Sequence, residues 1–131
     1  GTALQAHPQA ALLFFWRGQR RQVLIEGEVE QLSQQASTPY YQSRPRGSRI
    51  AAWASAQSRP IESYALLQQQ VAEQEGRFKT TEPPIPPYWR GFSLTPLRIE
   101  FWQEGDFRLH QRLVFSRPTV SQAWQSELLQ P

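Results

Sequence analysis

Four of the five residues from Pro83 to Pro87 are proline, and this run restricts the possible folds more than any other feature of the chain. Proline donates no backbone hydrogen bond and has a fixed φ, so regular helices and strands do not continue through such a run. We therefore expect the segment from Thr80 to Tyr88 to be an extended spacer inside the domain. Helical patterns occur immediately before it, and strand patterns follow it.

Two strand patterns lie near the N-terminus, after a short helical turn at Thr2–Ala6. Residues Ala11–Trp16 form a continuous apolar run, which is typical of a strand buried on both faces. Residues Gln22–Gln31 instead alternate between apolar and polar side chains, which is the period of a half-buried strand. The polar stretch Arg17–Arg21 joins the two, so we expect an antiparallel hairpin.

Three helices and three further strands are expected in the rest of the chain. The helical patterns cover Ser33–Ser43, Ser48–Ser55 and Ile61–Phe78. Pro45 separates the first two, because the residue before a proline avoids helical geometry. The strand patterns cover Phe92–Glu104, Phe107–Phe115 and Trp124–Leu129. Strands, then helices, then strands predict the α+β class, as an antiparallel barrel or sheet with helices on one side.

The composition of the 131 residues excludes several classes of chemistry. The chain has no cysteine, one aspartate (Asp106) and two histidines (His7 and His110). Thiol nucleophiles and thiolate zinc sites are therefore excluded, and a carboxylate-cluster metal site or a Ser-His-Asp triad is hard to assemble. Thirteen of the fourteen basic residues are arginine, which favours bidentate recognition of anions. We expect an anion-binding protein whose reactivity comes from a bound group.

Length and hydropathy predict one domain of a cytoplasmic protein. No apolar run reaches the roughly 18 to 20 residues that a membrane span requires, and no signal-peptide pattern is present. A nucleic-acid-binding function would require a basic run or stripe, whereas the arginines here alternate with glutamates. We therefore expect neither a membrane nor a nucleic acid as partner.

The first candidate site is the segment from Arg108 to Arg112. On an expected strand, Arg108, His110 and Arg112 would share one face and present a row of donors. A three-residue loop at Glu104–Asp106 would place Trp102 opposite Arg108. Such a row suits a planar anionic ligand, although a solvated cationic strand face has the same pattern.

The second candidate site consists of Tyr40, Arg44 and Ser48, which are spaced by four residues. A phenol, a guanidinium and a hydroxyl at that spacing could converge on one phosphate. Pro45 interrupts the helix, so convergence depends on an irregular turn. The alternative is that Tyr40 belongs to the core and Arg44 is a surface charge.

Five separated motifs keep their order and spacing along the whole chain. They are Arg21-Gln22-Val23, the stretch Tyr40–Trp53, Ala56-Gln57-Ser58, Ile99–Gln103 and Arg108–Arg112. Together they resemble the pyridoxine/pyridoxamine 5′-phosphate oxidase family. The resemblance implies an antiparallel split β-barrel of the FMN-binding type, with helices packed on one side, acting as a homodimer. It also implies FMN-dependent oxidation of pyridoxamine or pyridoxine 5′-phosphate to pyridoxal 5′-phosphate with O2 as acceptor. This reaction belongs to the biosynthesis of pyridoxal 5′-phosphate, the cofactor form of vitamin B6.

The resemblance assigns roles to individual residues. The residues that correspond to FMN contacts are Gln22, Gln57, Ser58, Trp102 and Arg112. Those that correspond to the substrate-phosphate site are Tyr40, Arg44 and Ser48. Arg108 and His110 correspond to catalytic residues that close over the substrate ring, and Leu109 lies between them in the same contact segment. No metal site is implied.

Members of the resembled family also carry upstream basic motifs that hold the FMN phosphate, and Gly1 corresponds to the residue just after them. Residues 1–131 are therefore expected to form a single domain that is the C-terminal portion of such an oxidase, without the first strands of its barrel. This expectation raises an alternative function. The chain would then be a non-catalytic dimerising or flavin-binding fragment.

Overall fold

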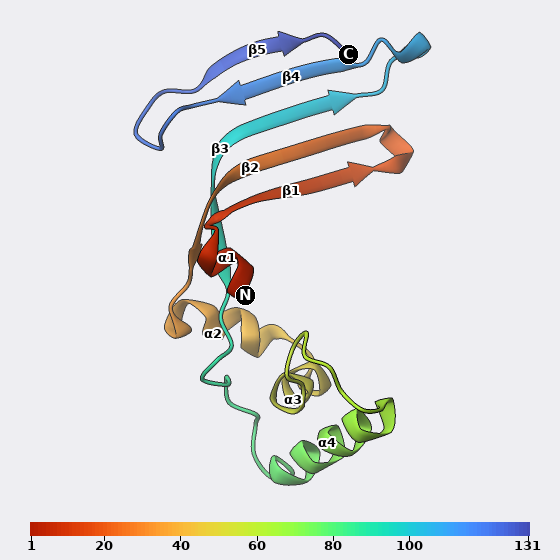
Figure 1. Ribbon diagram of the computed structural model, residues 1–131, viewed down its shortest axis with the longest axis vertical. Helices are drawn as coiled ribbons and strands as arrows, with labels where there is room; N and C mark the ends of the chain where they lie inside the picture. Colours follow the sequence, from red (N-terminus) through yellow and green to blue (C-terminus); the bar gives the residue numbers. More distant parts are fainter. The chain divides into compact units, whose positions relative to one another are not determined.

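The computed structural model describes residues 1–131, except for the side chain of Thr2. The chain forms two compact units (Figure 1). Residues Gly1–Gln31 and Phe92–Pro131 form the first, which we call the sheet unit. Residues Leu32–Gly91 form the second, which we call the helical unit. The helical unit is thus a single insertion between two strands of the sheet unit.

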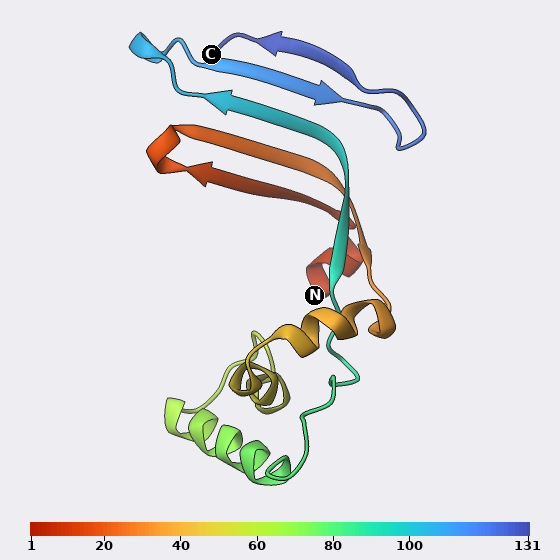
Figure 2. The ribbon, with the colours of Figure 1, turned by 180° about the vertical axis from the view of Figure 1, so that it is seen from behind.

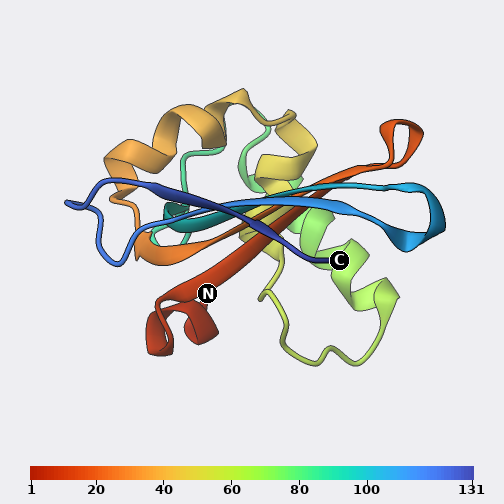
Figure 3. The ribbon, with the colours of Figure 1, turned by 90° about the horizontal axis from the view of Figure 1, so that it is seen from above.

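The sheet unit contains five antiparallel strands whose spatial order follows the sequence, β1-β2-β3-β4-β5. The strands are β1 (Gln9–Trp16), β2 (Arg21–Gln31), β3 (Phe92–Gln103), β4 (Gln111–Ser116) and β5 (Gln125–Leu129). A short helix α1 (Thr2–Ala6) precedes them, and the 3₁₀ turns η1 (Arg17–Gln19) and η2 (Asp106–Arg108) join β1 to β2 and β3 to β4. Figures 2 and 3 show the strands from behind and from above, with the twist expected of adjacent strands. The α+β class and the antiparallel sheet are confirmed.

The sheet is open across the described residues, with β1 and β5 as its edges. Sequence reasoning expected the apolar strand β1 to be buried on both faces, and this prediction is wrong. Leu13 and Phe15 are 60% and 57% exposed on one face, and Phe14 is 45% exposed on the other. The physical reason is that neither face of this strand is covered by a packed layer among the described residues, and β1 is in addition an edge strand that pairs only with β2.

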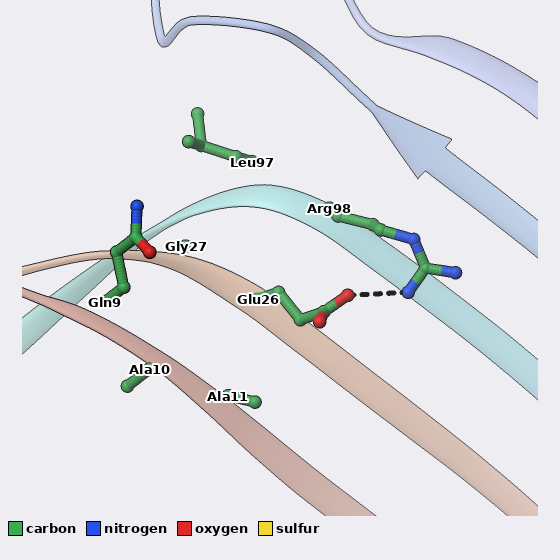
Figure 4. Close-up of a pocket in the computed structure, with 7 residues that line it drawn as sticks. All are labelled: Gln9, Ala10, Ala11, Glu26, Gly27, Leu97 and Arg98. Atoms are coloured by element: carbon green, nitrogen blue, oxygen red, sulfur yellow. Dashed lines mark hydrogen bonds and ion pairs between the residues drawn. The ribbon is translucent and has the colours of Figure 1, made fainter.

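A β-bulge between Glu26 and Gly27 changes the register of β2 against β3. A Cβ at Gly27 would lie 2.1 Å from the backbone oxygen of Thr95, so only glycine fits this close approach of the two strands. A pocket lies beside the bulge, and Figure 4 shows Glu26 and Arg98 paired at its wall, with 2.7 Å between Oε2 and Nη1.

The strand expected from Phe107 to Phe115 is shorter than predicted. β4 begins at Gln111, because residues Asp106–Arg108 form the turn η2. Phe107 and Arg108 have φ values of 54° and 66°, which belong to the left-handed region and are incompatible with an extended strand. The other predicted strands agree with the structure within a few residues.

The helical unit contains α2 (Gln34–Ser43), α3 (Arg46–Ala54) and α4 (Tyr64–Arg77). Pro45 separates α2 from α3, as expected. Helix α4 starts three residues later than the predicted Ile61, because Ser63 is its N-cap and accepts a hydrogen bond from the Leu66 amide at 3.1 Å. Among the described residues, no helix has the length and apolar character required to cross a membrane.

The proline-rich segment has no regular secondary structure, as its composition predicted. It packs against the helical unit through its carbonyl groups. The Pro84 oxygen accepts hydrogen bonds from the Tyr41 hydroxyl at 2.9 Å and from the Trp53 indole at 2.7 Å. Tyr41 is 1% exposed and Ile50 2%, so these two residues and the segment form the core of this unit.

Candidate functional site

Three of the predicted cofactor-binding residues form one row across the sheet. Gln22 of β2 lies opposite Trp102 of β3, and Trp102 lies opposite Arg112 of β4. Directly opposed residues in antiparallel strands project from the same face, so an amide, an indole and a guanidinium stand side by side. The expected pairing of Trp102 with Arg108 is wrong, because η2 shifts β4 so that Arg112 takes that position.

His110 lies beside this row although it is not part of a strand. Its ring centroid is 4.8 Å from that of Trp102. Its Nδ1 accepts a hydrogen bond from the Gly105 amide at 3.3 Å, so the neutral ring carries its proton on Nε2 and presents a donor there. A Cβ at Gly105 would lie 2.0 Å from the Leu109 oxygen, so the turn closes this tightly only with glycine.

The expected single-face row of Arg108, His110 and Arg112 is not formed, since only Arg112 lies on β4. Arg108 belongs to η2 and is exposed, with its backbone in the left-handed region. Leu109 follows it and is 67% exposed. Arg108 and Leu109 therefore lie in an exposed turn that leads directly to His110.

Sequence reasoning missed Glu100, whose carboxylate is buried beside the row. It is 6% exposed and accepts two hydrogen bonds from Arg112, Nε to Oε1 at 2.6 Å and Nη2 to Oε2 at 3.1 Å. Arg98 Nη2 donates a third at 2.6 Å. The Arg112 hydrogen bond lowers the pKa of Glu100, although burial acts in the opposite direction. The signal in the sequence was the alternation of Arg98, Glu100 and Trp102, which places all three on one strand face.

The residues expected to bind a phosphate lie in the helical unit, and two of them contact the same indole. The Tyr40 ring stacks on Trp89 with 6.2 Å between centroids, and the Arg44 guanidinium carbon lies 5.7 Å from the centroid of Trp89. Arg44 is the C-cap of α2, and Ser48 lies in the first turn of α3. The irregular turn that this site requires is therefore present at Pro45.

Gln57 and Ser58 are exposed in the turn that follows α3. Ser58 has a φ of 63°, in the left-handed region that side chains other than glycine rarely adopt. Such a backbone conformation is often found where a loop presents its groups to a ligand. Ser58 also lines a pocket that extends to Leu66 and Leu67 of α4.

The chemistry of the sheet unit's row fits a planar cofactor with polar edges. Gln22 supplies an amide donor and acceptor, Trp102 an aromatic face, and Arg112 a positive charge. Within the described residues, three of the five N–H groups of Arg112 have partners, two on Glu100 and one on the Gln130 oxygen at 3.2 Å. Two N–H groups remain for a ligand. The described residues contain no group of three or more His, Cys, Asp or Glu side chains that could hold a metal ion.

Two family models match the chain. Residues 1–78 match the model described as pyridoxamine 5′-phosphate oxidase, and residues 89–131 match the pyridoxine 5′-phosphate oxidase C-terminal dimerisation region. The pyridoxine/pyridoxamine 5′-phosphate oxidases of Brucella ovis and Brucella canis are each 47% identical to it over 131 residues. These alignments include the whole chain but 63% and 64% of the relatives, so the chain spans less than two thirds of their length.

Two solved structures have a similar fold. PhzG from Burkholderia lata 383, in complex with tetrahydrophenazine-1-carboxylic acid, superposes with a TM-score of 0.91 at 28% identity. That match covers 100% of this chain and 63% of PhzG. A pyridoxamine 5′-phosphate oxidase-related, FMN binding protein from Nostoc punctiforme superposes with a TM-score of 0.71 at 17% identity, covering 98% of this chain and 66% of that one. The second similarity concerns the fold alone, and both support a sheet of the split-barrel type.

Proposed function

The chain belongs to the pyridoxamine 5′-phosphate oxidase family, and on that premise we propose that it serves in FMN-dependent oxidation of a vitamin B6 phosphate. The substrates are pyridoxamine or pyridoxine 5′-phosphate, the product is pyridoxal 5′-phosphate, and O2 is the acceptor. One observation carries the proposal most directly. Gln22, Trp102 and Arg112 stand in register on one face of three adjacent strands.

FMN, when bound, supplies the redox chemistry that this chain's own side chains lack. Arg112, Gln22 and Trp102 would hold FMN at the row across the sheet. Gln57 and Ser58 would supply further contacts from their exposed turn. These contacts fix the orientation of a reactive ring, which is the main contribution that a protein makes to such chemistry.

The substrate's phosphate is held by Tyr40, Arg44 and Ser48. A guanidinium and two hydroxyls form charge-assisted hydrogen bonds with phosphate oxygens, and each contributes about 1.5 to 3 kcal/mol. Arg108 and His110 contact the substrate ring, where His110 donates from Nε2 because its Nδ1 is already occupied by the Gly105 amide. Leu109 adds an apolar contact from the same turn.

The B6 phosphates are favoured as substrates over a compound such as tetrahydrophenazine-1-carboxylic acid. PhzG was crystallised with tetrahydrophenazine-1-carboxylic acid, but its identity to this chain is 28%. The Brucella pyridoxine/pyridoxamine 5′-phosphate oxidases are 47% identical over the same residues. In addition, the positive charge and hydroxyls of Arg44, Tyr40 and Ser48 suit a phosphate monoester.

We also propose a cytoplasmic homodimer, in which residues 1–131 act as one domain and as the C-terminal portion of an oxidase. The match of residues 89–131 to a dimerisation region supports the dimer. The share of the relatives that the chain covers, 63%, supports its being a portion. The same match to a dimerisation region also supports a second candidate function, in which the chain dimerises or binds flavin without catalysis.

The test is to mix the purified chain with FMN, desalt it, and record the visible absorption spectrum. Retained flavin absorbance, followed by formation of pyridoxal 5′-phosphate from pyridoxamine 5′-phosphate under O2, supports the oxidase. A folded, colourless protein contradicts flavin binding by this chain and leaves dimerisation alone as its function.

Arg112→Ala sharpens this test. We expect it to raise the dissociation constant of FMN about tenfold or more, the effect of losing charge-assisted hydrogen bonds. Arg17→Ala removes the same charge from the exposed turn η1 and is the matched control. Equal affinities in the two variants would remove Arg112 from the flavin site.

A further inference from the structure

We propose that Glu100 is a positioning residue that fixes the Arg112 guanidinium in the orientation required to bind the flavin. The inference rests on the proposed function, since it assumes that Arg112 contacts FMN. It goes beyond that function because Glu100 itself is given no role there. The assignment starts from the burial and the partners of one carboxylate.

The contact between Glu100 and Arg112 is a two-point contact. Both oxygens of the carboxylate accept from the guanidinium, at 2.6 Å and 3.1 Å, so the plane of the guanidinium cannot rotate freely. The Gln130 backbone oxygen accepts a further hydrogen bond from Arg112 Nη1 at 3.2 Å and restricts the movement of the guanidinium on that side. The two remaining N–H groups therefore have a fixed direction before any ligand binds. Preorganised donors of this kind lose less entropy on binding.

Stability alone does not explain a carboxylate at this place. The residues directly opposite Glu100 are Leu24 of β2 and Val114 of β4, and Val114 is 2% exposed. An apolar side chain would suit those neighbours, and buried ion pairs are often no more stabilising than well-packed apolar residues. What an apolar residue could not do is hold Arg112 by two oxygens. Orientation of Arg112 is therefore the property that requires Glu100.

The carboxylate is itself held in place from the other side. Arg98 donates to Glu100 Oε2 at 2.6 Å and to Glu26 Oε2 at 2.7 Å, so four charges alternate as Glu26, Arg98, Glu100 and Arg112 across β2, β3 and β4. Figure 4 shows the outer pair, Glu26 and Arg98. In this chain of charges each carboxylate lies beside a cation, and Glu100 lies between two. The two guanidinium groups that contact it directly, those of Arg98 and Arg112, keep Glu100 ionised and in place.

Glu26 provides a matched control. Its side chain is 45% exposed and, among the described residues, it pairs with Arg98 and not with Arg112. Glu26→Gln therefore removes one carboxylate charge and one ion pair from the same ladder. It leaves both contacts between Glu100 and Arg112 in place. A general electrostatic or structural effect would appear in both variants.

The experiment measures FMN affinity of the 131-residue chain by quenching of flavin fluorescence. We expect Glu100→Gln to raise the dissociation constant about tenfold, whereas Glu26→Gln changes it less than about twofold. Glu100→Asp keeps the charge and should recover part of the affinity. Thermal unfolding without FMN is measured for each variant, so a loss of folding is separated from a loss of binding.

A double-mutant cycle tests whether Glu100 acts through Arg112. In an Arg112→Ala background, Glu100→Gln should cause no further loss of affinity, because the group that it positions is gone. The heteronuclear NOE of the Arg112 Nε–H group, measured without FMN, should be that of an ordered side chain in the wild type and in Glu26→Gln. It should fall in Glu100→Gln.

The outcomes separate the inference from the function on which it rests. If the wild-type chain binds no FMN, the proposed function fails and this inference with it. If the wild type binds FMN and Glu100→Gln binds it equally well, only the inference fails. Equal losses from Glu100→Gln in the wild-type and Arg112→Ala backgrounds, or an unchanged Arg112 Nε–H signal, would also overturn it.

Discussion

The two units hold their functional side chains by different means. In the sheet unit, strand register places Gln22, Trp102 and Arg112 side by side, and a buried carboxylate fixes the last of them. In the helical unit, Tyr40 and Arg44 come from the end of α2 and meet at the indole of Trp89, 45 or more residues later in the sequence. One site depends on backbone pairing and charge, the other on a single aromatic side chain.

This difference indicates where each site is vulnerable. A sheet row is supported by many backbone hydrogen bonds, so one truncated side chain leaves the neighbouring positions in place. In the helical unit, the single side chain of Trp89 contacts Tyr40, Tyr41 and Arg44. Its removal would therefore take away the support of all three residues together. Substitutions in the two units should therefore have effects of different size and kind.

The largest effect is expected from Trp89→Ala. It removes the ring that packs against the buried Tyr41 and against both phosphate-site residues, so the free energy of unfolding should fall by about 3 kcal/mol. The affinity for pyridoxine 5′-phosphate should fall with it. Urea unfolding and equilibrium binding of the phosphate ester measure the two quantities.

Trp124→Ala is the control for that prediction, since it removes an indole from the sheet unit. Trp124 is 38% exposed and lies under the Arg117 guanidinium, 4.5 Å from the ring centroid. It should cost less stability and leave the affinity for the phosphate ester unchanged. A similar loss of affinity in both variants would mean that the two sites are not held independently.

A smaller effect, confined to the sheet unit, is expected from Gly105→Ala. The new Cβ would lie 2.0 Å from the Leu109 oxygen, and the turn must open to accept it, at a cost of about 2 kcal/mol. Opening the turn removes the amide hydrogen bond to His110 Nδ1. The NMR chemical shifts of the His110 ring should then differ from those of the wild type, and oxidase activity should fall. Unchanged ring chemical shifts would show that the amide does not hold the ring.

Sequence reasoning predicted the features of the sheet unit that follow from the repeating side-chain pattern of a strand. It did not predict those that depend on the conformation of a turn. The strand patterns predicted that Trp102 lies opposite a basic residue of the next strand, and the class of the sheet followed from the same patterns. The register of β4 against β3 could not be predicted from these patterns, because it depends on the turn η2. There Phe107 and Arg108 have a left-handed backbone conformation although neither is glycine. Such conformations are set by the surrounding turn and carry no composition signal.

In the helical unit, sequence reasoning predicted where helices end but not which distant residues meet. Pro45 and the proline-rich segment predicted where the helices end, and both predictions are confirmed. The meeting of Tyr40 and Arg44 at Trp89 was not predictable, since no period links residues so far apart. Family resemblance supplied Tyr40, Arg44 and Ser48 as a set, whereas Trp89 is seen only in the structure. Likewise, Glu100 became a candidate only when its burial and its partners were known.

The smallest effect is expected from Gly76→Ala in α4, and its sign is opposite to that of Gly105→Ala. Nothing lies within 4 Å of a Cβ at Gly76, and the residue is helical, so the substitution meets no obstacle. Alanine loses less backbone entropy than glycine on entering a helix, which should stabilise the protein by about 0.5 to 1 kcal/mol. Urea unfolding measures this gain, and FMN affinity should not change. A loss of stability would mean that this end of α4 requires the freedom of glycine, and that the helical unit is as closely fitted there as the sheet unit is at Gly105.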